Sequence, residues 1–230
     1  MQFLFHSATR SERPIISESF LKIRKLYEDS KYQCRFYIKS NNTDGLSKCY
    51  NEFYEWQKKV CRMDQNSCMV FVHDDVEIYD SALCEKLETA FLDPDVVLVG
   101  VAGGKSFMLN RSNIVSWHTS CPPEAWAGAV AHLRPNGDVY VNSYGPTGTA
   151  VTVDGVFMAV RCQAMEEGLR FNEVFDFDFY DLAFSIDVYR AKKKAFVANI
   201  PILHHSHGLG IKDPKYAKAT DKFKEIYGNK

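Results

Sequence analysis

The sequence predicts an α/β fold, in which helices flank a mostly parallel, mixed central sheet. Short apolar runs alternate with helical patterns through the first half of the chain, which is the order that crossover connections between parallel strands produce. The run 69–72 contains no polar residue, as expected of a strand that is covered on both faces. A helix between two such runs is predicted from apolar residues at helical spacing, namely Leu46, Tyr50, Phe53 and Val60.

The remaining elements follow from the same patterns. Strands are predicted where short apolar runs occur, at 3–5, 35–38, 69–72, 96–101, 138–141, 150–160 and 195–203. Helices are predicted at 15–29, 46–61, 80–92, 180–193 and 215–227, and Asp80 is the expected N-cap of the third. The stretch 103–144 is rich in Gly, Pro, Asn, Ser and Trp without sustained periodicity, and it predicts a long functional loop with short strands.

Length and composition describe an ordinary globular chain. It has 230 residues, of which 46% are apolar and 25% charged, and this suits a single domain with a sizeable core. We expect that domain to cover 1–230, alone or as part of a longer enzyme, with two halves that meet near residue 102. The net charge of −1 attracts neither nucleic acid nor an anionic membrane, so neither is an expected partner.

Cysteine usage and the absence of long apolar runs predict a soluble protein in a reducing compartment. The seven cysteines are an odd number and form no C-x-x-C pair, which favours reduced thiols in a cytosol-like environment. The first six residues lack the basic and long apolar segments of a signal peptide. No apolar run approaches the roughly 20 residues that span a bilayer. We therefore expect a soluble, cytoplasmic protein without a transmembrane segment.

A His-Asp-Asp turn follows the apolar run 69–72 and consists of His73, Asp74 and Asp75. Ligands of open α/β sheets bind outside the carboxyl ends of the strands, where this turn is expected to lie. Carboxylate oxygens suit Mn²⁺ or Mg²⁺, and such an ion neutralises a diphosphate. The alternative is that Asp74 and Asp75 only cap a turn.

A second polar cluster, His204, His205 and His207, follows an apolar run that ends at Leu203. Imidazole is a common metal ligand. In an extended chain His205 and His207 face one side and His204 faces the other, so only one or two of them need be functional. The alternative is that a given histidine here is structural.

A third cluster places Asp176, Asp178 and Asp181 among aromatic residues at the start of a predicted helix. Carboxyl groups between aromatic side chains can have raised pKa values, which suits a general base. Capping of the helix by Asp178 or Asp181 explains one of these acids but not all three.

Taken in chain order, these segments resemble the GT-A glycosyltransferases, particularly glycosyltransferase family 2. The resemblance covers most of the chain and depends on the ordered set of segments rather than on any one of them. It implies a GT-A fold in which a Rossmann-like half, 1–102, binds a nucleotide-sugar, while 103–230 binds the acceptor and holds the catalytic residues. The segments are 41–42 with 45–47, 71–76, 100–103 with the Trp-bearing stretch after it, 153–158, 179–182 with Arg190, and 204–208.

The resemblance also implies roles for individual residues. Asp75 is the expected metal ligand, and one of the C-terminal histidines completes the metal or diphosphate site. His205 and His207 are assigned to the metal, and His204 to the nucleotide-sugar. Asp181 is the expected general base, with Asp178 in reserve. The other nucleotide-sugar residues are Ser7, Ala8, Thr9, Arg10, Ser40, Asn41, Asn42, His73 and Asp74, and the acceptor residues are Trp126, Asp154 and Gly155.

The implied reaction belongs to the hexosyltransferase class. A sugar passes from a nucleotide-diphosphate sugar, for which UDP is one candidate nucleotide, to a hydroxyl of a glycan or glycoconjugate. Mn²⁺ or Mg²⁺ stabilises the leaving nucleotide, and one base without a covalent nucleophile implies inversion. A loop with Trp117, His118 and Trp126 is expected to cover the donor and exclude water, unless its tryptophans belong to the core.

Two other classes of function stay open at the level of the sequence. A metal-dependent phosphoesterase or nucleotidyltransferase would use the same Asp and His residues around one or two ions. A non-catalytic, carbohydrate-binding relative of the fold is favoured by Ala183, because this branch has a second acid two residues after the position of Asp181. The donor base, the sugar, the acceptor and the linkage cannot be read from these motifs.

Overall fold

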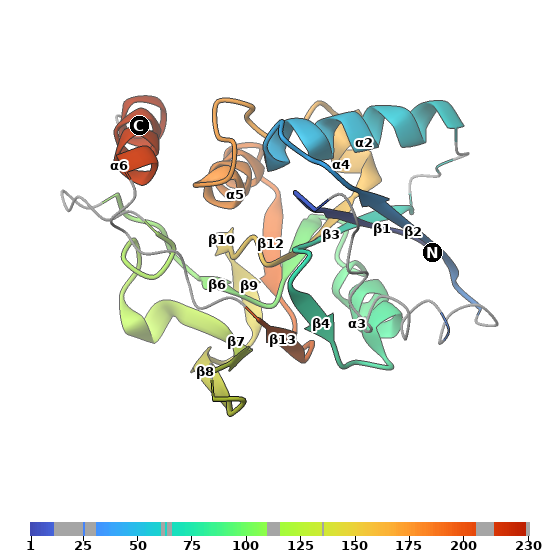
Figure 1. The fold of residues 1–230 in the computed structure, drawn as a ribbon, viewed down its shortest axis with the longest axis horizontal. Helices are drawn as coiled ribbons and strands as arrows, with labels where there is room; N and C mark the ends of the chain where they lie inside the picture. The colour runs from blue at the N-terminus through green and yellow to red at the C-terminus, as the bar shows by residue number, and fades with distance from the viewer. Residues whose placement is uncertain are drawn as a thin grey trace.

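The computed structural model describes residues 1–11, 25, 31–60, 63, 66–109, 116–134, 136–205 and 214–228. Its centre is a mixed sheet (Figure 1), in which five strands run parallel to one another and two run antiparallel to their neighbours. The seven strands lie in the order β2 (Gln33–Lys39), β1 (Gln2–Ala8), β3 (Cys68–Val72), β11 (Phe157–Arg161), β5 (Val96–Gly100), β12 (Lys194–Val197) and β9 (Gly148–Ala150).

A second sheet continues from the first at the turn 73–75. That turn joins β3 to β4, which is the edge strand of the second sheet. The order in this sheet is β10 (Thr152–Val153), β6 (Ala102–Gly104), β7 (Trp126–Leu133), β13 (Ile202–His204) and β4 (Val76–Ile78), with β8 (Val139–Gly145) paired to β7. The two sheets therefore meet where the His-Asp-Asp turn lies.

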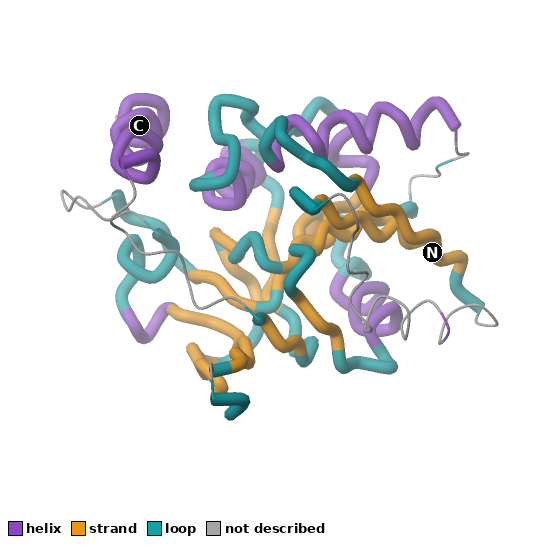
Figure 2. Tube along the Cα trace, in the orientation of Figure 1, coloured by secondary structure: helices purple, strands orange, loops and turns teal. Residues whose placement is uncertain are grey.

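Helices cover both faces of the central sheet, as Figure 2 shows by the purple tubes above and below the orange strands. In Figure 1, α2 (Leu46–Val60), α4 (Cys162–Glu166) and α5 (Tyr180–Arg190) lie on one side, and α3 (Leu83–Ala90) lies on the other. Every residue of β3 and β5 is buried between these layers. The last helix, α6 (Pro214–Tyr227), packs through Phe223 against Phe175 and Phe179. No helix among the described residues is long and apolar enough to cross a membrane.

The predicted α/β class, with a mixed central sheet between helices, is confirmed. The described cysteines hold free thiols, as expected. The predicted helix 15–29 lies outside the described residues except for Lys25. The elements expected at 3–5, 35–38, 46–61, 69–72, 96–101, 138–141, 180–193 and 215–227 are all present, with shifted ends.

Two predicted strands are wrong as single elements. The run 150–160 is divided by a turn at Asp154 and Gly155, so that β10 belongs to the second sheet and β11 to the first. The run 195–203 is divided in the same way into β12 and β13. Pro201 lies between them and has no N–H to donate to a continuous ladder. Apolar composition marks both halves of each run as buried but does not mark the change of sheet.

Two further predictions need correction. The third helix begins at Leu83 rather than near Asp80, whose Oδ1 accepts the N–H of Ala82 before the helix starts. The stretch 103–144 contains the antiparallel pair β7 and β8 in addition to short elements. A register shift between Gly128 and Ala129 interrupts the alternation along β7, which explains why the pattern resembled a loop. Strands β9, β11 and β12 from the second half complete the sheet of the first half.

Candidate active site

A cavity of about 500 Å³ lies at the carboxyl ends of β1, β2 and β3. Parallel strands end at the same edge of a sheet, so the residues that follow them come together there. Five residues that were assigned to the nucleotide-sugar line this cavity, namely Ala8, Thr9, Arg10, Asn42 and Asp74. The rest of the lining consists of Ser11, Thr43, Gly45, Leu46, Asp176, Phe177 and Lys215. The volume is in the range of small-molecule sites.

Backbone hydrogen bonds hold the two loops that form one wall of the cavity. The N–H of Thr9 donates to the carbonyl of Lys39 at 2.9 Å, and the N–H of Asn42 donates to the carbonyl of Thr9 at 2.9 Å. Ser7 is buried within β1, and Asn41 turns the chain with a φ of 53°. Ser7, Ser40 and Asn41 are therefore near the cavity in sequence but are not part of its lining.

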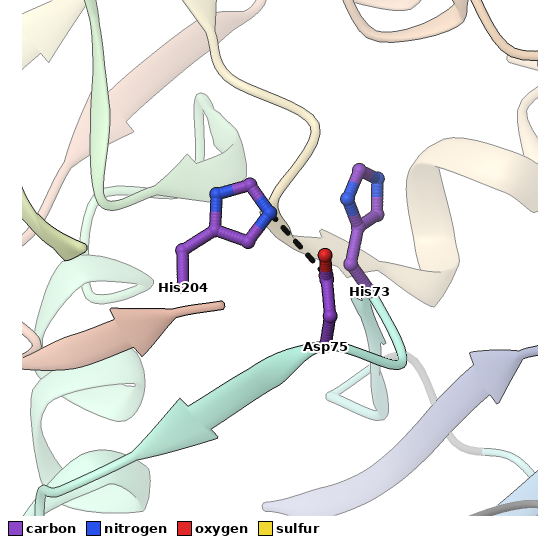
Figure 3. A group of neighbouring side chains, drawn as sticks. All are labelled: His73, Asp75 and His204. Carbon is purple, nitrogen blue, oxygen red and sulfur yellow. Dashed lines mark ion pairs between the residues drawn. The ribbon is translucent and has the colours of Figure 1, made fainter. Parts of the chain in front are cut away.

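His73, Asp75 and His204 form a compact group at the junction of the two sheets (Figure 3). One possible ligand atom from each lies within 4.8 Å of the others. His73 and Asp75 belong to the turn before β4, and His204 ends β13, which pairs antiparallel with β4. This pairing brings Nε2 of His204 to 3.3 Å from Oδ1 of Asp75. Asp74, between the two ligands in the turn, lines the cavity, so the group and the cavity adjoin.

The ionisation of this group suits a divalent cation. Burial lowers the pKa of His73, so its imidazole is neutral and can act as a ligand. Burial alone would raise the pKa of Asp75, but His204 and His73 outweigh that effect and lower it. Oδ1 of Asp75 is buried and lacks a well-formed hydrogen bond with any described residue, despite its 3.3 Å contact with His204. A cation would provide the missing partner.

The tautomer of His73 is set by Tyr180. The hydroxyl of Tyr180 donates to the carbonyl of Gly155 at 2.8 Å and lies 2.8 Å from Nε2 of His73. Because its single proton is directed to Gly155, this hydroxyl accepts the Nε2–H of His73. Nδ1 of His73 then keeps the lone pair that a metal ligand requires.

Of the other histidines of the C-terminal cluster, only His205 is described, and it does not join this group. Nε2 of His205 lies 2.7 Å from Oε1 of Glu77, away from Asp75. His207 lies outside the described residues. We therefore replace His205 by His204 in the candidate metal set and move His73 into it. Among the described residues, no second group of three such ligands lies this close together.

The carboxyl group of Asp181 lies at the start of α5, close to Asp154. Its Oδ2 accepts the N–H of Gly155 at 2.8 Å, and its Oδ1 accepts the N–H of Leu182 at 2.7 Å. Burial and the nearby charge of Asp154 together raise the pKa of Asp181 to about 7, although the two N–H donors oppose the shift. A carboxyl group with this pKa can take up a proton near neutral pH. Asp178 is half-buried and lies one turn earlier, before the helix begins.

The local backbone around Asp181 is tightly constrained. Phe179, the residue before α5, adopts a left-handed φ of 66°, which is unusual for a bulky side chain. Its ring packs against Phe223 of α6, which holds this conformation. A Cβ at Gly155 would lie 2.2 Å from the hydroxyl oxygen of Tyr180, so only glycine fits there. Strained residues of this kind are often found at functional sites.

The predicted aromatic loop lies beside Asp154. Trp117 is 4% exposed, and its Nε1 donates to Oδ2 of Asp154 at 2.9 Å. Its ring stacks on His118 at 3.6 Å between centroids, and Nε1 of Trp126 donates to the carbonyl of His118. Trp117 is thus a core residue that holds Asp154, whereas Trp126 and His118 are half-buried beside it.

Several residues of the site were not assigned from the sequence. Tyr180 orients His73, and no spacing rule reveals this, because the contact spans 107 positions. Asp176 and Phe177 were noted only as parts of the acid-aromatic cluster, yet both line the cavity with Gly45. Lys215 of α6 also lines the cavity. It belongs to a lysine-rich helix, and that composition predicts only an exposed helix face, not a binding residue.

Comparison with known proteins identifies the family. A model described as "Glycosyltransferase like family" matches residues 12–227. This chain belongs to the glycosyltransferase-like family. Among solved structures, A197 from STIV is similar in fold, with a TM-score of 0.51 and 11% sequence identity over 90% of this chain and 86% of that chain. No curated protein sequence matches the chain.

Family membership gives the site its context. The glycosyltransferase-like family supports a sugar-transferring protein, and the His73, Asp75 and His204 group offers such a protein a possible metal site. The likeness to A197 from STIV concerns the fold alone.

Proposed function

We propose that this glycosyltransferase-like chain is an active, metal-dependent enzyme that transfers a sugar from a nucleotide-diphosphate sugar to an acceptor hydroxyl. The observation that supports it most is the convergence of His73, Asp75 and His204 beside the 500 Å³ cavity. A diphosphate placed between the cavity and this group would meet a divalent cation where its charge needs neutralising. The half 1–102 would then hold most of the donor, and 103–230 the acceptor.

The ligand set favours Mn²⁺ over Mg²⁺ in this proposal. Two imidazoles and one carboxylate are nitrogen-rich, and Mg²⁺ prefers oxygen ligands with several bound waters. When bound, the cation would act as a Lewis acid on the departing nucleotide. The neutral state of His73 and the ionised state of Asp75 leave both ready to bind it.

Asp181 is the general base of the proposed reaction. The acceptor oxygen forms a bond to the anomeric carbon while the bond from that carbon to the diphosphate oxygen breaks, and Asp181 takes the acceptor proton. With Asp181 as the base and no covalent intermediate, the anomeric configuration inverts. Asp154 supports this role because its charge raises the pKa of Asp181.

The acceptor is proposed to be a carbohydrate that approaches along Asp154, Gly155 and Trp126. Asp154 and Gly155 border Asp181, so an acceptor hydroxyl bound there would be within reach of the base. Trp126 and His118 supply half-buried ring surfaces on which an apolar sugar face can pack.

Metal-dependent nucleotide-sugar binding tests the proposal. Thermal melting and calorimetry with UDP-, GDP- and dTDP-sugars should show stabilisation that requires Mn²⁺. His204→Ala should abolish the Mn²⁺-dependent part, because His204 contributes to the ligand group. His205→Ala is the matched control, since its ring pairs with Glu77 and should leave Mn²⁺ binding intact.

Two results would contradict the proposal. One is nucleotide-sugar binding that is equal with and without Mn²⁺ in the folded wild-type chain. The other is turnover of phosphodiesters without any acceptor sugar, which would indicate a phosphoesterase instead. Slow hydrolysis of the donor with Mn²⁺ present would support a transferase and count against a non-catalytic binding protein.

A further inference from the structure

Two cysteine side chains meet between the central sheet and helix α3. Sγ of Cys34, in strand β2, lies 3.8 Å from Sγ of Cys84, in the first turn of α3. The two residues are 50 positions apart in the sequence, and both hold thiols. A disulfide bond places its sulfurs about 2.05 Å apart, so the two side chains need to approach by less than about 2 Å to form one.

The alternation of side chains along β2 directs Cys34 toward α3. Tyr37 packs against Phe53 and Trp56 of α2, at 5.3 and 5.1 Å between ring centroids. Successive residues of a strand point to opposite faces, so Cys34, three positions before Tyr37, faces away from α2. Helix α3 covers that other face of the sheet (Figure 1).

A second contact holds the same two segments together. The hydroxyl of Tyr32 donates to Oε2 of Glu88 at 2.8 Å. Tyr32 lies two residues before Cys34, and Glu88 lies about one helical turn after Cys84, so the two contacts are neighbours. A bond between the two sulfurs would therefore follow packing that the fold already has.

The described thiols differ in their access to solvent and in their ionisation. Cys34 is half-buried and Cys84 is fully buried, so an oxidant that enters from solvent meets Cys34 first. Cys49 is different, because it is buried and its Sγ lies 3.3 Å from Nε2 of His6. Burial raises the pKa of Cys49 to about 11, which keeps it a protonated and unreactive thiol near neutral pH.

We propose that Cys34 and Cys84 form a site of reversible oxidation, at which a small disulfide of the glutathione type converts the two thiols into a disulfide bond between β2 and α3. The thiolate of Cys34 attacks one sulfur of oxidised glutathione, whose S–S bond breaks, and one glutathione leaves with the proton that Cys34 gave up. The thiolate of Cys84 then attacks Sγ of Cys34, and the second glutathione leaves in the same way. The protein loses two electrons and two protons, and the oxidised glutathione gains them as two thiols. This inference does not depend on the proposed function.

The cross-link should stabilise the fold without changing the donor cavity. It closes a loop that spans 50 positions, which restricts the unfolded chain. We expect oxidation to raise Tm by about 5–10 °C. Cys34 lies at the start of β2, whereas the donor cavity lies at the carboxyl ends of the strands.

Oxidation of the folded 230-residue chain in glutathione buffers tests the proposal, with acid quenching, alkylation of remaining thiols and peptide mass spectrometry. The wild-type chain should yield peptides joined through Cys34 and Cys84, and dithiothreitol should separate them. Cys34→Ser and Cys84→Ser should each lose both the joined peptides and the rise in Tm. Cys49→Ser is the matched control, because it removes a buried thiol of the same half and keeps the pair.

Four outcomes would overturn the proposal. The first is the absence of a link between Cys34 and Cys84 in folded wild-type protein, and the second is a link that forms only in denaturant. The third is glutathione that stays attached to Cys34, which would show that Cys84 does not reach the mixed disulfide. The fourth is a rise in Tm on oxidation that is equal in wild type and Cys34→Ser. The first three are read on the wild-type chain, so they hold even where a variant fails to fold.

Discussion

The hydroxyl of Tyr180 lies 2.8 Å from Nε2 of His73 and so connects helix α5 to the His-Asp-Asp turn. The same hydroxyl donates to the carbonyl of Gly155, beside Asp154. One side chain thereby fixes the tautomer of a candidate metal ligand and contacts the turn that borders the proposed base. Partners of this kind commonly set the affinity of the metal site.

Tyr180→Phe should weaken Mn²⁺ binding by about 10- to 100-fold. Without the hydroxyl, the Nε2–H of His73 loses its acceptor and the ring is free to change tautomer. Calorimetric titration of Mn²⁺ measures the effect. Tyr189→Phe is the control, because Tyr189 is on the same helix but exposed. Equal Mn²⁺ affinity in Tyr180→Phe and wild type would show that the hydroxyl does not orient His73.

The rate of sugar transfer should rise with pH and level off above about 7. Asp181 acts as a base only when ionised, and its pKa is raised to about 7, so kcat/KM falls about tenfold per pH unit below that value. Asp154→Asn removes the neighbouring negative charge and should move the midpoint to lower pH. The profile is measured at saturating Mn²⁺, with Asp187→Asn as a control on the same helix. A profile of Asp154→Asn that coincides with wild type would argue against Asp181 as the base.

Gly45→Ala should reduce nucleotide affinity as well as stability. The φ of Gly45 is +77°, and an added Cβ would lie 2.8 Å from Cα of Asp176, so the wall of the cavity must move. Gly137→Ala is the matched control, because its φ is +87° and an added Cβ meets nothing within 4 Å. Both variants should lose about 1–2 kcal/mol of stability from the left-handed backbone, measured by denaturant unfolding. Only Gly45→Ala should weaken nucleotide-sugar binding, and equal binding by the two variants would contradict the packing of Gly45 against Asp176.

Mn²⁺ should bind more tightly than Mg²⁺, by roughly tenfold or more, because two of the three ligands are imidazoles. His204→Asp replaces one nitrogen ligand by a carboxylate and should narrow the difference. Competition between the two ions, read by calorimetry, measures the ratio. A wild-type preference for Mg²⁺ would contradict the assignment of His73 and His204 as ligands.

The fold was predictable to a large degree because its central strands are buried on both faces. The unbroken run of β3 and the apolar stripe of α2 each leave a local pattern in the sequence. An Asp-Gly dipeptide and a proline mark the breaks at Asp154–Gly155 and at Pro201, but they do not show which sheet the next segment joins. That choice depends on which partner strand each segment meets.

The candidate site was predictable at the ends of strands and less so elsewhere. Asp74, Asp75, Thr9 and Asn42 lie within four residues of the end of a predicted apolar run, and all of them are found in the cavity wall or the candidate metal group. The choice between His204 and His205 depends on which face of β13 meets the His-Asp-Asp turn. That face is set by pairing with β4, a contact more than 120 positions away in sequence.

The junction between the two sheets has a thermodynamic consequence. His73 follows a strand of the first sheet and His204 ends a strand of the second, so an ion shared by them bridges the sheets. Cation binding and the docking of β13 against β4 are then linked equilibria, and each strengthens the other. Removing the ion with a chelator should accelerate amide hydrogen exchange in β4 and β13 first, while the interior strands β3 and β5 keep their protection.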